Sequence, residues 1–362
     1  MLKELKIFTR RMIAGANVAM VLLMLFVGYS DHLHPQSFPL LCNVGLVFPF
    51  FIVGNLAFLV FWLLVWPRYG LISLVGFLLA YSPVRTYMPL NRHRDVPQGA
   101  IKVLTYNVFL FVPWDVPKGQ PNPILEYIRA CDADIVCLQE ASYHELKKKN
   151  HDAVMKKLYA HYDTICKSRG EWMAVYSKFP ILSKERIEYE SQSNMSGAFK
   201  LLVGGDTVIV INNHLETNHI SLAEKRDFKS MVKGEMGRDT MQSVSKLLAG
   251  KLAEAARKRA PEAEAVARYI ARHRGESIIL CGDFNDNPIS YARRTIAKNL
   301  TDCYVETGFG PGISYHENGM YFRIDNIMCS DDWQPYNCKV DNKIAVSDHY
   351  PMYCWLKKRA KH

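Results

Sequence analysis

Polar side chains end several short apolar runs of this chain, and their types point to one kind of chemistry. The stretch ILCGDFNDNPIS, residues 279–290, passes from an apolar run into two acids, two amides and a proline. Taken alone, each such residue is more often a strand cap or a turn residue than a ligand. Because strand ends of a sandwich cluster at one edge, we expect the whole set to converge on one site. Its members are Asn107, Glu140, His214, Asp283, Asn285, Asp325, Asn326, Asp348 and His349.

This set favours metal-assisted hydrolysis of a phosphoester. Carboxylates and amides without Cys pairs or multiple-His spacing favour a hard cation such as Mg²⁺, and Glu140 is the first choice for its ligand. His214 and His349 can donate hydrogen bonds to charge that develops on a phosphoryl group. Asp325 can fix the tautomer of one histidine, and Asp283 can orient or deprotonate the attacking water. The sum is a metal-assisted phosphohydrolase.

The stretch 279–290 itself divides into strand, site and turn. Residues 279–281 read as a buried strand, and Gly282 permits close backbone approach at its end. Phe284 is expected to pack inward between the two site residues Asp283 and Asn285. The following residues 286–288 are typical of a turn that leaves the site.

Short Val-, Ile- and Leu-rich runs closed by polar residues predict strands, with helices between them at 123–130 and 141–159. This mixture indicates an α/β fold in which helices cover sheets. The runs are IKVLTYNV, ADIVCLQE, MAVYSK, TVIVINNHLE, SIILCGDFN, YFRIDNIMCS and SDHYPMYCWL.

A charged, Ala-rich segment at 222–273 stands apart, with Pro261 predicted to break it into two helices. One interpretation is a basic lid on a membrane surface or over the substrate. The other is a solvated amphipathic helix pair on the flank of the domain.

The first 90 residues predict a membrane anchor of three helices, at about 12–30, 39–66 and 70–90, because long stretches here lack charged residues. A cleaved signal peptide is the alternative for the first of them. Four cations precede the first run and the loop after it has no Lys or Arg, so the N-terminus is expected in the cytoplasm and the following domain outside it. Arg85, Arg92 and Arg94 argue for the opposite orientation.

Bulk composition adds less. None of the nine cysteines forms a C-x-x-C pair, so buried free thiols are favoured over a disulfide framework. The formal charge of +10 suits an anionic substrate or an anionic lipid surface without distinguishing them.

From about 100 to 356 the chain resembles the metal-dependent endonuclease/exonuclease/phosphatase superfamily. Six stretches are similar to its motifs in the same order: LTYNV, LQEAS, INNHLE, CGDFND, RIDNI and SDHYP. The resemblance implies a four-layer α/β sandwich of two packed mixed sheets flanked by helices, here over residues 98–362 after the anchor. It departs at Asn326, where the family usually has an aromatic residue.

The resemblance also implies roles for the site residues. It assigns Glu140 to a Mg²⁺ ion, or alternatively Mn²⁺, with Asn107 and Asp348 near the metal. It makes Asp283 and Asn285 the residues that orient water and bind phosphate. It makes His214 and His349 transition-state stabilisers, with Asp325 as the partner of a histidine.

Three hypotheses remain for the function. The apolar spans and the aromatic loop FLFVPWDVP at 109–117 favour a phospholipid headgroup or another membrane-proximal phosphate ester, so that the partners are a lipid and the bilayer rather than nucleic acid. The basic charge supports a membrane-bound nuclease as the alternative. A non-catalytic binding module on the same fold is the third.

Overall fold

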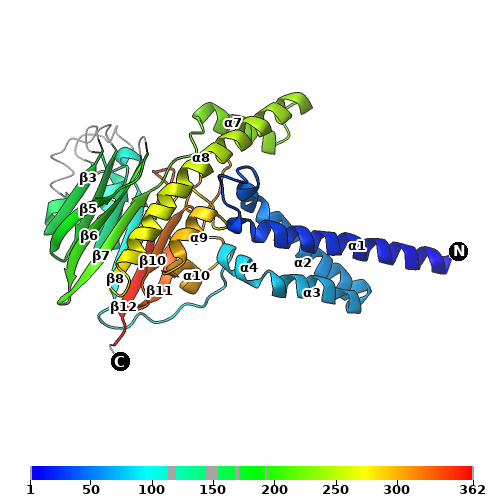
Figure 1. Cartoon of the computed structure of the whole chain (residues 1–362), viewed down its shortest axis with the longest axis horizontal. Helices are drawn as coiled ribbons and strands as arrows, with labels where there is room; N and C mark the ends of the chain where they lie inside the picture. Colours follow the sequence, from blue (N-terminus) through cyan, green and yellow to red (C-terminus); the bar gives the residue numbers. More distant parts are fainter. Residues whose placement is uncertain (1, 113–119, 143–153, 168–170, 192–193, 361–362) are drawn as a thin grey trace.

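Two packed β-sheets form the centre of the molecule (Figure 1). The computed structural model describes all residues except 1, 113–119, 143–153, 168–170, 192–193 and 361–362. In strand order, the first sheet contains β11 (Trp333–Val340), β12 (Met352–Lys358), β1 (Ile101–Asn107), β2 (Ile135–Gln139), β4 (Trp172–Ser177) and β3 (His161–Cys166). The second contains β5 (Ile181–Ile187), β6 (Met195–Val203), β7 (Asp206–His214), β8 (Ser277–Asp283), β10 (Asp325–Cys329) and β9 (Thr301–Asp302).

Both sheets mix parallel and antiparallel pairs, which decides where the polar residues lie. β1 runs parallel to β2 and β7 runs parallel to β8, whereas β12 and β10 run antiparallel to β1 and β8. The prediction that Asp325 and His349 end strands is wrong, because Asp325 begins β10 and His349 precedes β12. They still reach the edge where β1, β2, β7 and β8 end, since an antiparallel strand starts where its neighbour stops.

Four layers result from the way apolar residues are distributed on the sheets. The space between the sheets is filled by fully buried side chains such as Val103, Phe199 and Ile279. The outer face of the first sheet packs on α5 (Pro123–Cys131), and that of the second on α8 (Arg238–Arg272) and α9 (Tyr291–Ala297). Each fully buried aliphatic side chain contributes about 1.5–3 kcal/mol. The predicted four-layer α/β sandwich is confirmed.

The charged segment forms two helices, but they do not break at the predicted place. α7 (Leu222–Val232) ends well before Pro261. α8, which is 35 residues long in total, continues through Pro261 without a break. A proline inside a helix leaves the carbonyl four residues earlier without its N–H donor. Here the side chain of Gln36 donates to that carbonyl, at Arg257, over 3.1 Å, so the helix continues.

The second half of α8 packs against the second sheet and forms part of the sandwich. Ala263, Val266 and Ile270 are buried and pack in the same cluster as Ile278 and Leu280 of β8. α7 differs, because none of its residues is buried. The segment therefore packs on the flank of the domain through the second half of α8, and the lid interpretation stays a prediction.

Before β1 the chain forms a bundle of apolar helices: α1 (Leu2–Gly28), α2 (Phe48–Val65), α3 (Gly70–Leu79) and α4 (Tyr81–Tyr87). Three 3₁₀ segments join them: η1 (Ser30–His32), η2 (Leu41–Val47) and η3 (Pro67–Tyr69). In the described residues, two helical stretches, Lys3–His32 and Leu41–Val65, are long and apolar enough to cross a membrane. The region expected to be one third helix is divided at Ala80, and Pro83 leaves the Leu79 carbonyl to accept from the Tyr29 hydroxyl at 2.7 Å.

A buried polar cluster holds α1, α2 and α3 together. The side-chain oxygen of Asn17 accepts from Trp62 Nε1 at 2.9 Å and from Ser73 Oγ at 3.1 Å. Its amide nitrogen donates to Asn55 Oδ1 at 3.4 Å. Asn17, Asn55, Trp62 and Ser73 are all fully buried, in helices whose outer surfaces are apolar. One asparagine therefore connects three helices.

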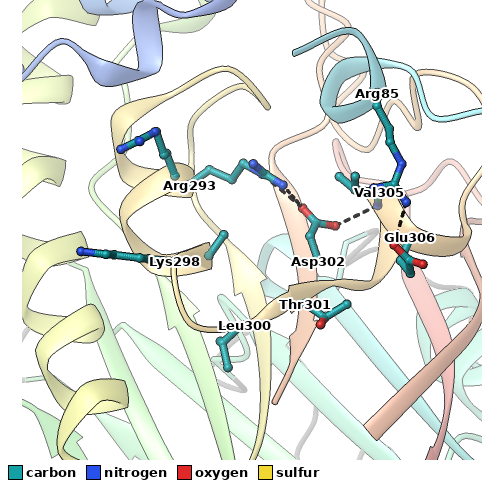
Figure 2. Close-up of a pocket in the computed structure, with 10 residues that line it drawn as sticks. Arg85, Arg293, Lys298, Leu300, Thr301, Asp302, Val305 and Glu306 are labelled. Atoms are coloured by element: carbon teal, nitrogen blue, oxygen red, sulfur yellow. Dashed lines mark hydrogen bonds and ion pairs between the residues drawn. The ribbon is translucent and has the colours of Figure 1, made fainter. Parts of the chain in front are cut away.

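The bundle is attached to loops of the sandwich by packing and by polar contacts. Ile289, in the loop after β8, is buried in the same cluster as Met24 and Phe48 of the bundle. Arg323, which is 3% exposed, donates to the Thr86 and Tyr87 carbonyls at the end of α4. Beside this junction lies a cavity of about 490 Å³, where Arg85 pairs with Glu306 at 2.7 Å (Figure 2).

All nine cysteines are free, as expected, and seven of them are buried. The exceptions are Cys131, which is half-buried, and Cys166, which is exposed. Part of the helix expected at 141–159, including its lysine cluster, lies outside the described residues, as do residues 113–117 of the aromatic loop.

We predict that Asn17→Leu loosens the helical bundle. The substitution leaves the Trp62 and Ser73 donors unpaired in an apolar environment, at a cost of about 1–3 kcal/mol for each buried group. Thermal unfolding of the detergent-solubilised protein, followed by tryptophan fluorescence, should show a lower midpoint. Leu22→Ala, at a position of α1 that is 61% exposed, is the control and should leave the midpoint nearly unchanged. Equal midpoints for both variants would contradict the role of Asn17.

Candidate active site

Asp283 lies at the centre of the polar residues that the two sheets bring together. Its Oδ2 atom lies 3.2 Å from Asn107 Nδ2, 3.8 Å from His214 Nε2 and 3.6 Å from His349 Nε2. Its other oxygen accepts the backbone N–H of Asn285 at 2.7 Å. Asp283 is 1% exposed. The end of β8 therefore presents one buried carboxylate to residues from both sheets.

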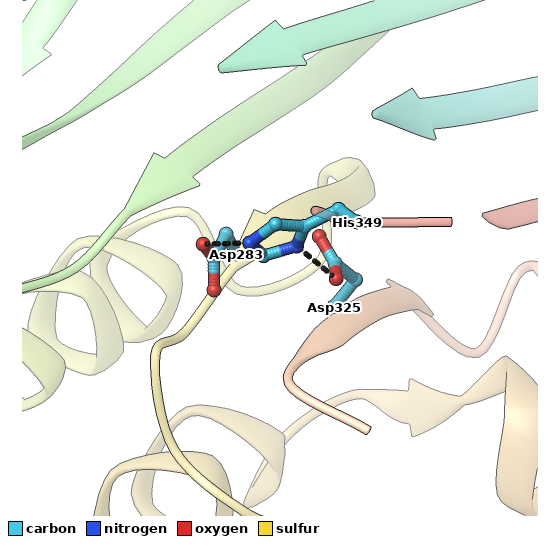
Figure 3. A group of neighbouring side chains, drawn as sticks. All are labelled: Asp283, Asp325 and His349. Carbon is cyan, nitrogen blue, oxygen red and sulfur yellow. Dashed lines mark hydrogen bonds and ion pairs between the residues drawn. The ribbon is translucent and has the colours of Figure 1, made fainter. Parts of the chain in front are cut away.

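Each of the two histidines is held by its own carboxylate. His349 Nδ1 lies 2.8 Å from Asp325 Oδ2 (Figure 3), and His214 Nδ1 lies 2.6 Å from Glu171 Oε1. The sequence predicted a histidine partner for Asp325 but missed Glu171. Glu171 directly precedes β4, which runs antiparallel to β2, so it reaches the site from the start of a strand as Asp325 does. A search for acids before strands, and not only after them, would have found it.

These carboxylates keep both imidazoles charged. Burial lowers the pKa of His349, but Asp325 and Asp283 outweigh it and raise the pKa to about 10. Burial likewise lowers the pKa of His214, and Glu171 and Asp283 raise it to about 10. At neutral pH both rings therefore carry a proton on Nε2. Nε2 of His214 is buried and has no hydrogen-bond partner among the described residues, so it is a donor ready for a ligand.

The acids of the site are not neutralised by the histidines alone. Burial raises the pKa of Glu140, His214 lowers it, and Glu171 and Asp348 raise it further. Burial also raises the pKa of Asp283, against the lowering effect of His349. A site that concentrates carboxylates and raises their pKa values fits a divalent cation, which would restore the charge balance.

The donor atoms fit a hard cation such as Mg²⁺. Glu140 is partly exposed and half-buried Asp348 lies near enough to influence its charge. Asn107 turns its amide nitrogen to Glu140 Oε1 at 3.0 Å, because its oxygen accepts the Phe109 N–H at 3.1 Å. In this arrangement Asn107 positions the carboxylates of Glu140 and Asp283, and its side-chain oxygen is not directed to a cation.

A second group could be considered for a metal. Asp283, Asp325 and His349 have possible ligand atoms within 4.8 Å of one another (Figure 3). However, an imidazole that binds a metal must be neutral, and both aspartates favour the protonated form of His349. We therefore interpret this group as a hydrogen-bonded triad, beside oxygen ligands led by Glu140.

Gly282, Phe284 and the turn that follows are arranged as predicted for the stretch 279–290, whereas phosphate binding by Asn285 stays a prediction. Gly282 has φ of +136°, and a Cβ atom there would lie 2.0 Å from the Asn213 carbonyl oxygen, so no side chain fits. Phe284 is fully buried. Asn285 has a φ of +52°, and its side-chain amide nitrogen donates to the Leu215 carbonyl at 2.9 Å. Asp286 pairs with Arg259 at 3.1 Å as the chain turns away.

A buried polar bridge joins the sheets directly beneath the site. Gln139 of β2 donates to Asn212 of β7 at 2.7 Å and to Thr105 of β1 at 3.1 Å. Asn212 in turn donates to the Leu138 carbonyl at 3.0 Å. These three side chains are fully buried beside the apolar core between the sheets. The bridge fixes how the edges of the two sheets face each other.

Comparisons with known proteins agree with this fold. The sequence model of the endonuclease/exonuclease/phosphatase family matches residues 104–349, and that of a domain of unknown function (DUF8431) matches residues 10–87. No curated protein matches the chain.

Solved structures resemble the chain at low sequence identity. Sphingomyelinase C from Streptomyces griseocarneus is 17% identical, with 71% of this chain and 99% of that chain covered and a TM-score of 0.50. A functionally unknown conserved protein from Enterococcus faecalis is 16% identical, with 72% and 100% covered and a TM-score of 0.50. A humanized TDP2 from D. rerio is 13% identical, with 72% and 99% covered and a TM-score of 0.49. At such identities the first two likenesses show a shared fold.

We predict that Asp325→Asn lowers the pKa of His349 below its value of about 10, because the variant loses the main group that opposes the effect of burial. The measurement is a histidine ¹³C NMR titration of the full chain in EDTA, with the resonance assigned through His349→Gln. Asp331→Asn, at an exposed position, is the control and should not move that resonance. An unchanged titration of His349 in Asp325→Asn would refute the pairing.

Proposed function

Because the chain belongs to the endonuclease/exonuclease/phosphatase family, we propose that it is a Mg²⁺-dependent phosphoester hydrolase held at a membrane by its N-terminal helices. Members of this family hydrolyse phosphoesters, and the fold supports a hydrolase. One observation carries the proposal: two charged, carboxylate-held histidines direct Nε2 toward the same buried aspartate, Asp283. Such a pair can receive the negative charge of a phosphoryl group from two sides.

The residues of the chain divide the work of hydrolysis. Asp283 orients a water molecule and takes its proton as the water oxygen bonds to phosphorus. The bond from phosphorus to the leaving oxygen breaks in the same displacement, and that oxygen takes a proton from solvent. His214 and His349 donate from Nε2 to the phosphoryl oxygens, while Glu171 and Asp325 hold the rings in place. A bound Mg²⁺, held by Glu140 with Asp348 nearby, would supply positive charge to the phosphoryl group. Asn107 holds Glu140 and Asp283 in place, because its amide nitrogen donates to both carboxylates.

The substrate that we propose is a phospholipid headgroup or another phosphate ester close to the membrane. Two helices have the length and composition to cross a bilayer. The bundle packs on Ile289, only six residues beyond Asp283, so the site is held close to the helices. Residues 1–90 would be the anchor and residues 98–362 the catalytic domain.

We propose that the catalytic domain lies outside the cytoplasm. The N-terminus lies at the end of α1 that is farthest from the sandwich (Figure 1). If α1 crosses the membrane, its N-terminus and the domain are on opposite sides. Lys3, Lys6, Arg10 and Arg11 cluster at that end, and such clusters remain in the cytoplasm.

A membrane-bound nuclease is the second candidate, and the formal charge of +10 favours it. A panel of sphingomyelin, phosphoinositides and plasmid DNA, offered to the detergent-solubilised chain with Mg²⁺ or EDTA, separates the candidates. We expect lipid turnover that requires Mg²⁺. DNA cleavage without lipid turnover would establish the nuclease, and no turnover of any substrate would favour a binding module.

We predict that His349→Ala lowers kcat by about 10²–10³-fold, the effect of removing one positioned donor to the transition state. Glu140→Gln should instead weaken the apparent affinity for Mg²⁺ by about 10- to 100-fold or more. Both are measured as initial rates against Mg²⁺ concentration. Glu188→Gln, at an exposed ion pair with Arg186, is the control and should retain full activity. Unchanged rates in both site variants would overturn the assignment.

A further inference from the structure

α7 begins beside the active site, and its first turn is firmly attached there. Ser221 and Glu224 form a capping box at its N-terminus. Glu224 also pairs with Lys251 of α8 at 2.6 Å, and Lys251 donates to the His219 carbonyl at 2.8 Å. His219 is five residues beyond the catalytic-site residue His214. The side chains of the first turn of α7 are therefore held at a defined place near the site.

The next residue on this turn, Lys225, reaches the rim of the site. Its ammonium nitrogen lies 5.1 Å from the centre of the Tyr315 ring. Tyr315 forms a backbone bridge with His349, and the two rings meet edge to face with centres 5.2 Å apart. The Tyr315 ring therefore contacts both the Lys225 ammonium group and the ring of a catalytic histidine.

The surroundings of Tyr315 are acidic, so Lys225 is an unusual charge in this region. Burial raises the pKa of Tyr315, and Asp348, Glu317 and Asp283 raise it further. The charges that act most strongly on Asp283 and Glu140 come from acids and the two histidines. Lys225 itself is half-buried and makes no ion pair with any residue that the structure describes. Its positive charge is therefore available to a ligand.

We propose that Lys225 is a specificity-determining residue that binds a second anionic group of the substrate. Because Lys225 contacts the Tyr315 ring beside His349 and pairs with none of the described site carboxylates, the ammonium group meets the part of the substrate next to the scissile phosphate rather than the scissile phosphate itself. The substrate class is then a phosphoester with another phosphate or carboxylate close by. A quaternary ammonium headgroup at the same place is repelled. The inference rests on the proposed hydrolase function and names the headgroup chemistry of that site.

The experiment compares phosphatidylinositol 4-phosphate, which has a second phosphate, with phosphatidylinositol and sphingomyelin in mixed micelles, using the full chain. Lys225→Ala should raise KM for phosphatidylinositol 4-phosphate about tenfold or more, the value of one charge-assisted hydrogen bond, with kcat almost unchanged. The KM for phosphatidylinositol should not change. Lys225→Arg should restore the preference, and Lys225→Glu should reverse it toward sphingomyelin.

Lys233→Ala is the matched control, because it removes the same charge from the exposed far end of α7. The ammonium group of Lys233 forms an ion pair with Glu235 at 3.7 Å and with no other residue that the structure describes. It should leave every KM unchanged. An equal KM for phosphatidylinositol 4-phosphate in Lys225→Ala and the parent chain, or an equal effect of Lys233→Ala, would overturn the proposal.

Direct binding keeps this test separate from that of the hydrolase function. Calorimetric titration with inositol 1,4-bisphosphate, in Mg²⁺, needs no turnover. Weaker binding to Lys225→Ala than to the parent chain, with an unchanged thermal midpoint, supports the rim site even if no lipid is hydrolysed. Equal binding to both chains overturns it even if hydrolysis is observed.

Discussion

The buried bridge between Gln139 and Asn212 is the interaction on which the site depends. These residues belong to different sheets, and their hydrogen bond of 2.7 Å crosses an interface whose core is apolar. Glu140 directly follows Gln139, and His214 stands two residues beyond Asn212. Because strands are stiff, the bridge also sets the relative positions of the residues that follow it on each strand. Glu140 Oε1 accordingly lies 3.8 Å from His214 Nε2. An apolar pair at this place would fill the same volume without setting that register.

Above the bridge, the arrangement is governed by charge. Burying a carboxylate is costly unless it is paired, and burying a histidinium is equally costly. The chain places two imidazolium groups among five carboxylates: Glu140, Glu171, Asp283, Asp325 and Asp348. When all are ionised, three negative charges are left over, and a divalent cation offsets most of them. Burial raises the pKa values of Glu140 and Asp283, neighbouring acids raise them further, and the same carboxylates raise the pKa values of both histidines against the effect of burial. A divalent cation would thus complete a site whose own charges do not balance.

The parts that sequence predicted correctly are those decided by local pattern. Apolar runs located the strands around the site, and polar residues beyond them located Asp283 and His214. Antiparallel pairing is a non-local property, so Asp325 was placed at the wrong end of its strand and Glu171 was missed. Pro261 was read by its local rule as a helix break, but Gln36, which is more than 200 residues away in the chain, satisfies the carbonyl that the proline leaves free. Tertiary contacts of this kind leave no signal in the spacing of residues.

One loop connects the site with the helical bundle, so the bundle contributes to the geometry of the site. Asp283 stands at one end of the segment 283–289, and Ile289 at the other end is buried among Met24 and Phe48. Gly45 of the bundle approaches so closely that a Cβ atom there would lie 2.4 Å from the Ile289 carbonyl oxygen. Close packing of this kind transmits displacement, because neither side has free volume to absorb it. The position of Asp283 is therefore set jointly by the sheets and by the bundle, and with the membrane anchoring that we propose, the bilayer would also orient the site.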